Sequence, residues 1–142
     1  MTKKRVIGTS ISNIYAAETE LGRKLPQSFS DWLILNNGVS LGAVTIFPVF
    51  DARDPRKTWD SIVRNFKGRW QEWLENFSDL ALDFSQLMPF AEFGTGDYYC
   101  FDYSTEGDIG EPVVIVWLHE TGEVKQVADC FAQFSTSSDR FG

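Results

Sequence analysis

Histidine and cysteine side chains are the residues of this chain that could transfer a proton or attack a substrate near neutral pH. The chain has one histidine, His119, and two cysteines, Cys100 and Cys130. An imidazole exchanges protons in this range and a thiolate is a strong nucleophile, so His119 paired with a cysteine is the enzymatic alternative. However, His119 follows an apolar run, where a structural histidine is typical, and the sequence contains no GxSxG, HExxH, P-loop or GxGxxG motif. We therefore expect no catalytic residue and no enzyme activity.

Metal binding would require ligands at particular spacings. Cys100 and Cys130 stand 30 positions apart without a CxxC motif, and one histidine leaves too few ligands for a structural zinc site. We interpret both cysteines as reduced core residues. A calcium loop that begins at Asp102 has oxygen ligands at its early positions, but its twelfth position is Val113 instead of glutamate. We expect neither a metal ion nor a cofactor.

Acidic side chains gather in the second half of the chain and are the candidates for partner binding. The chain has 142 residues and a formal net charge of −7. Residues 1–70 contain 11 basic and 6 acidic residues, whereas residues 71–142 contain 2 basic and 14 acidic residues. This distribution favours a basic partner steered to the acidic half, and it argues against nucleic acid as the ligand. The candidate partner-binding residues are Asp97, Asp102, Glu106, Asp108, Glu111, Glu120 and Glu123. Two alternatives stay open: the acidic loops only keep the protein soluble, or the two halves fold together and partly cancel.

Basic and aromatic residues alternate between positions 56 and 77, a mixture that could stack on single-stranded bases. The aromatic residues of this segment recur at steps of three and four, so a helix with a buried aromatic stripe and a solvated basic face explains them more simply. We expect no nucleic acid partner.

The elements that must position these residues begin with helices. Capping and stop signals predict a first helix from Ser12 or Asn13 to Gly22, and a second from Pro26 to Asn37-Gly38. Ala43 to Phe47 is predicted as a short strand, and 51–57 as a loop. A third, long helix is predicted from Asp54 or Thr58 to Phe77, with a break or close packing at Gly68, where glycine costs about 1 kcal/mol against alanine.

The second half of the chain changes to a strand pattern. The predicted strands are 87–93 and 98–103 around the turn 94–97, then 113–118 and 124–128. The unbroken apolar run at 113–118 suits a central strand that is buried on both faces. A loop is expected over 104–111, and Asp129 is expected to cap a last short helix. The order of elements predicts an α+β fold, in which helices pack on a mainly antiparallel sheet, with a mixed sheet as the alternative. We expect a single domain over residues 1–142.

No apolar run approaches the roughly 18 residues of a membrane-spanning helix, and the N-terminal segment lacks the apolar stretch of a secretion signal. We therefore expect no membrane partner and a cytoplasmic location.

Four segments together carry a family resemblance. They are ELGRKLPQSFSDWLILNNG (20–38), PFAEFGTGDYYCFD (89–102), EPVVIVWLHE (111–120) and VADCFAQF (127–134). In order and spacing they resemble the SUKH superfamily over about residues 11–136. The signature positions are Leu25-Pro26, Asn37-Gly38, Gly96-Asp97 and Asp102.

This resemblance implies an α+β fold with a mixed or antiparallel sheet, no catalysis, and function through protein binding. The superfamily includes regulators of cell-wall synthesis in yeast and bacterial immunity proteins that neutralise toxins, often nucleases. The leading hypothesis is an immunity protein that binds a cognate toxin, such as a basic nuclease. The alternative is a housekeeping scaffold or regulator that binds an endogenous protein, as in cell-wall synthesis. Fold alone does not decide between them.

Overall fold

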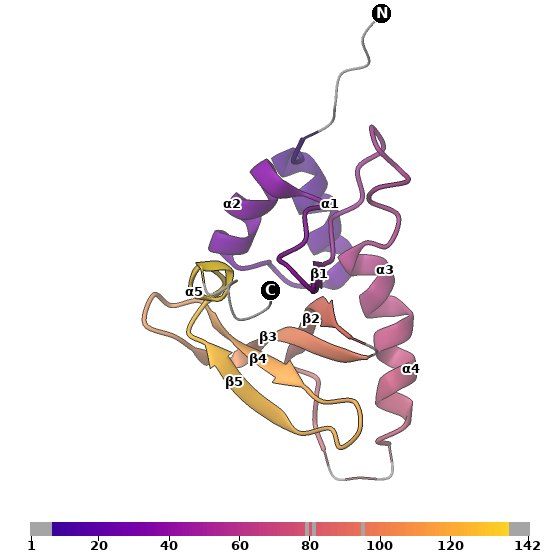
Figure 1. The fold of residues 1–142 in the computed structure, drawn as a ribbon, viewed down its shortest axis with the longest axis vertical. Helices are drawn as coiled ribbons and strands as arrows, with labels where there is room; N and C mark the ends of the chain where they lie inside the picture. Colours follow the sequence, from indigo (N-terminus) through magenta and orange to yellow (C-terminus); the bar gives the residue numbers. More distant parts are fainter. Residues whose placement is uncertain (1–6, 79, 81, 95, 137–142) are drawn as a thin grey trace, which may run out of the picture.

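The computed structural model describes residues 7–78, 80, 82–94 and 96–136, and Figure 1 shows helices α1 and α2 stacked over one end of a sheet. The elements in chain order are α1 (Ile11–Leu21), α2 (Gln27–Asn36), β1 (Val44–Ile46), α3 (Ile62–Lys67), α4 (Arg69–Glu75), β2 (Leu87–Phe93), β3 (Asp97–Glu106), β4 (Pro112–Trp117), β5 (Val124–Ala128) and α5 (Phe131–Thr136).

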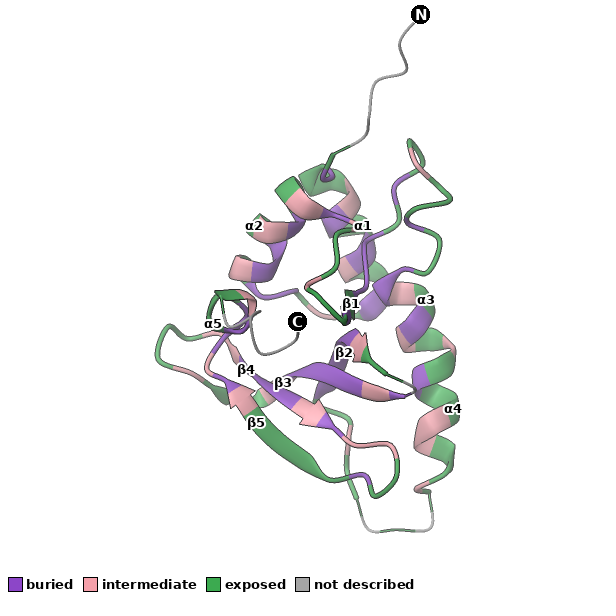
Figure 2. Ribbon diagram, in the orientation of Figure 1, coloured by how far each residue is buried: buried purple, intermediate pink, exposed green. Residues whose placement is uncertain are grey.

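The five described strands form one sheet in the order β1-β2-β3-β4-β5, and every neighbouring pair is antiparallel. The predicted α+β fold is thus confirmed. Of the two predicted sheet types, antiparallel and mixed, the described strands form the antiparallel one. Strand β3 lies at the centre, because Tyr98 is in register with Glu92 of β2 and Trp117 of β4. Strand β4 lies between β3 and β5, so the prediction of a central, buried strand at 113–118 is confirmed by an interior strand. Its apolar run is buried because both faces of the sheet are covered, whereas the edge strand β5 is largely exposed (Figure 2).

Local capping signals set the ends of the first two helices. Helix α1 begins at Ile11, slightly earlier than predicted, because the Ser10 hydroxyl accepts a hydrogen bond from the Asn13 amide. It ends where Gly22, at φ 76°, donates its amide to the Glu18 carbonyl. Pro26 stands just ahead of α2 instead of inside its first turn, and Gly38 takes the positive φ after the helix.

The long third helix of the sequence prediction is two short helices, and it does not begin at Asp54 or Thr58. The Thr58 hydroxyl accepts the Asp51 amide across a loop, and Ser61 caps α3 instead by accepting the Arg64 amide. The expected break lies at Gly68, whose φ of −106° and ψ of −98° separate α3 from α4. As a result Trp59 lies outside any helix and is 57% exposed, contrary to its predicted place in the core.

Two further predictions about the second half need correction. Strand β3 continues through Ser104 to Glu106, so the loop before β4 is shorter than expected. Within residues 96–136, no helix amide donates to the Asp129 carboxylate. It accepts the amide of Asp108 at 2.7 Å, which joins the β3–β4 loop to the segment before α5.

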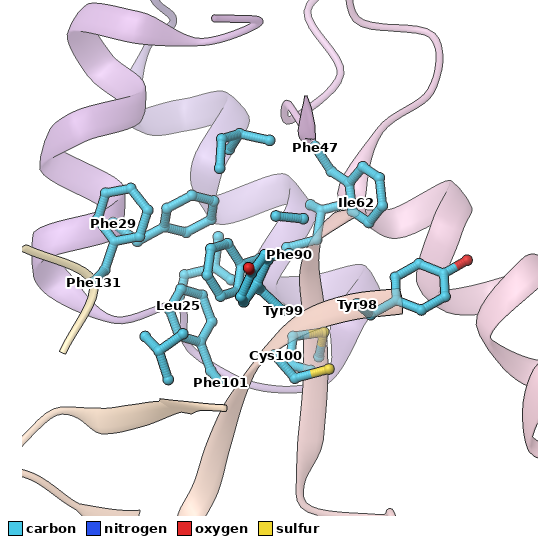
Figure 3. Packing of buried hydrophobic residues seen from close by; sticks show 14 of the residues in the cluster. Leu25, Phe29, Phe47, Ile62, Phe90, Tyr98, Tyr99, Cys100, Phe101 and Phe131 are labelled. Carbon is cyan, nitrogen blue, oxygen red and sulfur yellow. The ribbon is translucent and has the colours of Figure 1, made fainter. Parts of the chain in front are cut away.

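One face of the sheet is closed by phenylalanine side chains, which we call the Phe cluster. Its members are Phe29 from α2, Phe90 from β2, Phe101 from β3, and Phe131 and Phe134 from α5. Each is at most 1% exposed, and the Phe90 and Phe101 rings stack with centroids 4.1 Å apart (Figure 3). Burying a phenylalanine side chain contributes roughly 1.5–3 kcal/mol, so this cluster is a main source of stability.

The opposite face is covered by a second group, the Trp cluster. Its members are Trp70 and Trp73 from α4, Phe77 and Phe84 from the segment between α4 and β2, and Trp117 from β4. Side chains alternate between faces along a strand, so Tyr98 points away from Phe101 and packs on Trp70 at 5.6 Å. Figure 3 shows Tyr98 directed toward the side of α3 and α4. Trp117 is central to this cluster, because its ring contacts the other four members.

Candidate functional site

Two of the seven predicted partner-binding residues meet in a surface groove. Asp102 of β3 and Glu123, just before β5, both line it although they are far apart in the sequence. We call it the acidic groove; its volume is about 510 Å³, and it is lined by Leu82, Asp83, Phe84, Gln86, Leu87, Asp102, Ser104, Gly122, Glu123 and Val124. The segment 82–87 that leads into β2 forms one wall, and the other comes from β3 and the turn before β5.

The acidic groove combines carboxylates with apolar surface. Asp83, Asp102 and Glu123 supply the negative charge, and none of its lining residues is basic. Leu82 and Val124 are 46% and 42% exposed, so apolar walls stand beside the carboxylates. A lysine or arginine side chain has a matching composition, because its aliphatic stem packs on apolar surface while its charged head reaches a carboxylate.

Local hydrogen bonds hold two of these carboxylates in place. Asp102 accepts bonds from the Ser104 amide at 2.9 Å and the Ser104 hydroxyl at 2.6 Å. Asp83 accepts the Ser85 amide at 2.9 Å, and hydrogen bonds from the Ser85 side chain and amide lower the pKa of that carboxyl. The groove therefore presents Asp83 as a charged group near neutral pH.

Sequence reasoning missed Asp83. The signal that could have found it is the repeated pattern Asp-aromatic-Ser, which occurs at 83–85 and again at 102–104. Both copies form the same short turn, in which the serine amide two residues on binds the aspartate carboxylate. Only the tertiary fold brings the two copies to one groove.

Two other predicted residues are engaged within the fold. Glu111 accepts bonds from the Ser28 amide at 3.0 Å and the Ser28 hydroxyl at 2.6 Å. This places a carboxylate at the first turn of α2, where helix amides lack intrahelical partners. Asp97 accepts the His119 amide at 3.1 Å and lies 2.7 Å from the His119 ring nitrogen Nδ1. Both residues are half-buried, so each stabilises the protein's own structure.

The last three predicted residues are exposed and lie outside the acidic groove. Glu106 and Asp108 belong to the end of β3 and the following loop, and Glu120 lies in the turn between β4 and β5. Asp108 uses its amide to bind Asp129, which leaves its carboxylate at the surface. Their charges contribute to the negative field of the acidic second half of the chain.

His119 and the cysteines do not show the features of a catalytic pair. The His119 ring packs on Trp73 with centroids 5.2 Å apart, and its side-chain partner is Asp97. Cys100 and Cys130 are buried free thiols. Burial raises the pKa of the Cys100 thiol well above its usual value, which keeps it protonated near neutral pH.

Neither a metal-ligand cluster nor a membrane-spanning helix is present among the described residues. No three His, Cys, Asp or Glu side chains among them gather closely enough to hold a metal ion. None of the described helices combines the length and apolarity that crossing a bilayer requires.

The helix-covered antiparallel sheet defines this chain as an α+β protein. Residues 8–137 match the model of the SMI1 / KNR4 family (SUKH-1), and the chain belongs to that family. This confirms the SUKH resemblance seen in the sequence. Members of the family bind other proteins and are generally not enzymes.

Comparison with known structures supports the same fold. A protein from Pseudomonas syringae pv. tomato, known from a crystal structure, superimposes with a TM-score of 0.59 at 18% sequence identity. The match covers 95% of this chain and 86% of that protein. At this identity the likeness shows the fold alone. No curated protein matches this chain.

Proposed function

We propose that this protein is a non-enzymatic immunity protein of the SUKH family, which binds and neutralises a cognate toxin domain. The observation that carries the proposal is the acidic groove, where Asp102 and Glu123 stand beside exposed apolar walls with no basic lining residue. A groove of this composition suits a lysine or arginine of a basic partner, such as a nuclease whose own ligand is a polyanion. Occupying that basic segment would block the toxin's substrate site.

The predicted acidic residues divide into two roles under this proposal. Asp102 and Glu123, joined by Asp83, contact the partner, and close charge pairs across an interface can contribute about 1.5–7 kcal/mol of coupling. Exposed Glu106, Asp108 and Glu120 steer the partner during approach. Glu111 and Asp97 support the surface from within, because their carboxylates already bind Ser28 and His119.

The proposal is tested with a catalytically inactive toxin domain encoded beside this chain's gene. The variant Asp102→Lys/Glu123→Lys is compared with Glu72→Lys/Glu75→Lys, which makes the same change in net charge on exposed residues of α4. We expect the groove variant to weaken binding by about a hundredfold, measured by titration calorimetry, and the α4 variant by less than about fivefold. Equal losses would show that only net charge matters and would exclude the groove as the contact.

The second hypothesis is a regulator that binds a basic segment of an endogenous protein, and the family match favours it equally. Co-expression separates the two. An immunity protein protects cells from the neighbouring active toxin, and the groove variant loses that protection. If the unmodified chain gives no protection but captures a cellular protein through Asp102 and Glu123, the regulatory hypothesis takes its place.

A further inference from the structure

A second surface groove lies between α1, the loop that leads into α3, and α3 itself. We call it the aromatic groove; its volume is about 520 Å³, and it is lined by Asn13, Ala16, Ala17, Glu20, Phe50, Trp59, Ser61, Val63 and Arg64. Figure 1 shows the loop between β1 and α3 beside α1, at the end of the molecule away from the β4–β5 turn. The aromatic groove shares no lining residue with the acidic groove.

We propose that the aromatic groove is a second docking site, which binds an acidic peptide segment of a partner protein through one apolar anchor residue. The walls have the composition of an anchor pocket. Trp59 is 57% and Phe50 is 44% exposed, and the small side chains of Ala16 and Ala17 leave room between them. Grooves in which exposed aromatic rings flank small residues take apolar side chains, because binding removes both surfaces from water.

The charges at the groove select an acidic segment. Glu20, its one acidic lining residue, is neutralised by an ion pair with Lys67. The Arg64 guanidinium lies over the Trp59 ring, 4.6 Å from its centroid, and no carboxylate of the described residues pairs with it. A partner carboxylate next to the anchor would therefore meet a cation that is already oriented by the ring and free to form a bidentate bond.

The arrangement of rings favours a peptide over single-stranded nucleic acid. Sequence-tolerant stacking on bases needs successive exposed rings along a basic track. Between positions 59 and 77, Trp59 is exposed but Trp70 is buried and Trp73 is half-buried against the sheet. The neighbouring cations Lys67 and Arg69 are held by Glu20 and by Asp60 with Glu92. The two exposed rings of the groove, Trp59 and Phe50, flank small alanine side chains, and this is the arrangement of an anchor site for one apolar residue.

The test uses the full chain labelled with ¹⁵N and a synthetic probe, acetyl-Glu-Asp-Phe-Leu-Glu-Asp-amide. Titration to about 1 mM peptide, followed by NMR, is expected to shift the Trp59 indole and the Ala16 and Ala17 amides in a saturable manner. A control peptide with lysine at every acidic position is expected to bind at least about tenfold more weakly.

Two matched pairs of variants locate the contact. Trp59→Ala is expected to weaken the probe about tenfold, whereas Tyr15→Ala, which removes a ring that is also 57% exposed but lies outside the groove lining, leaves affinity unchanged. Arg64→Glu is expected to weaken it similarly, while Lys125→Glu on β5 makes the same change in net charge without effect. Thermal unfolding of each variant verifies that it is folded.

Several outcomes would overturn the proposal. These are no saturable shift at about 1 mM probe, shifts that avoid the groove residues, or equal binding of the lysine control peptide. Tighter binding of an oligothymidylate to the same residues would assign the groove to nucleic acid. Shifts of the groove residues that grow with protein concentration alone, together with a rising sedimentation coefficient, would assign it to a second copy of this chain. None of these results depends on the toxin assay, so this proposal and the proposed function of the acidic groove are tested independently.

Discussion

The two faces of the sheet are both covered by aromatic side chains, but they differ in what else they bury. The Phe cluster consists of hydrocarbon rings, all at most 1% exposed, beneath α2 and α5. The Trp cluster contains half-buried Trp73, Phe77 and Phe84, and polar groups lie within and beside it. Among the described residues, the Tyr98 hydroxyl and the Trp117 indole nitrogen are buried without a hydrogen bond of normal geometry.

This difference separates stability from recognition. The hydrocarbon rings of the Phe cluster gain the most from burial, and they offer no polar group to a partner. The Trp-cluster face is covered less completely, and Phe84 belongs both to that cluster and to the wall of the acidic groove. The candidate binding surface thus lies beside half-buried members of the Trp cluster, where polar and charged residues remain accessible.

The difference between the two faces is tested most strongly by replacing one phenylalanine on each face with alanine. Phe101→Ala removes a fully buried ring and is expected to lower the free energy of unfolding by about 3–5 kcal/mol. Phe84→Ala removes a half-buried ring, and we expect a loss of about 1–2 kcal/mol because less apolar surface is involved. Urea unfolding of both variants measures the difference, and equal losses would contradict the distinction between the faces.

A second test concerns Glu111, whose carboxylate binds the start of α2, the helix that packs on the Phe cluster. Glu111 binds the Ser28 amide and hydroxyl at the start of α2, the helix that carries Phe29. Glu111→Gln weakens a charge-assisted contact, and we expect a loss of about 1–2 kcal/mol in the free energy of unfolding. Glu106→Gln is the matched control, since Glu106 is exposed in the same hairpin. A similar loss in both variants would mean that net charge, and not the contact with α2, is responsible.

The smallest effect near neutral pH is expected at Tyr98 in the Trp-cluster face. Its hydroxyl is buried without a normal hydrogen bond, so Tyr98→Phe removes a desolvated polar group and should change the free energy of unfolding by less than about 1 kcal/mol, toward higher stability. A loss of more than this in urea unfolding would reveal a hydrogen bond to the hydroxyl that matters in solution.

Alkaline pH should enlarge the effect of that same substitution. Burial raises the pKa of Tyr98 to about 12, whereas a tyrosine in the unfolded chain ionises near pH 10. A raised pKa favours the folded state fully below about pH 10, and that contribution is lost as the pH rises from about 10 toward 12. The free energy of unfolding should therefore fall less steeply above about pH 10 in Tyr98→Phe than in the unmodified protein. Parallel curves would show that Tyr98 ionises equally in both states.

Sequence patterns predicted the elements whose signals are local. A strand-like pattern and turn glycines located β2 and β5, and Gly22 and Gly68 marked helix ends where the structure has them. The site was harder to predict. Asp102 and Glu123 were identified from charge alone, but the same reasoning could not separate them from Glu111, whose carboxylate turns inward to Ser28.

The sequence by itself determined the family, the α+β class and the acidic character of the second half, because motif order, periodicity and charge count do not depend on distant contacts. The tertiary structure decided which residues form sites. Trp59 lies outside a helix because Thr58 bonds to Asp51 instead of capping the next turn. Asp83 and Glu123 meet Asp102 because the segment before β2 and the turn before β5 reach one surface of the folded sheet. Such encounters depend on strand register and on packing between residues far apart in the chain, which local patterns do not encode.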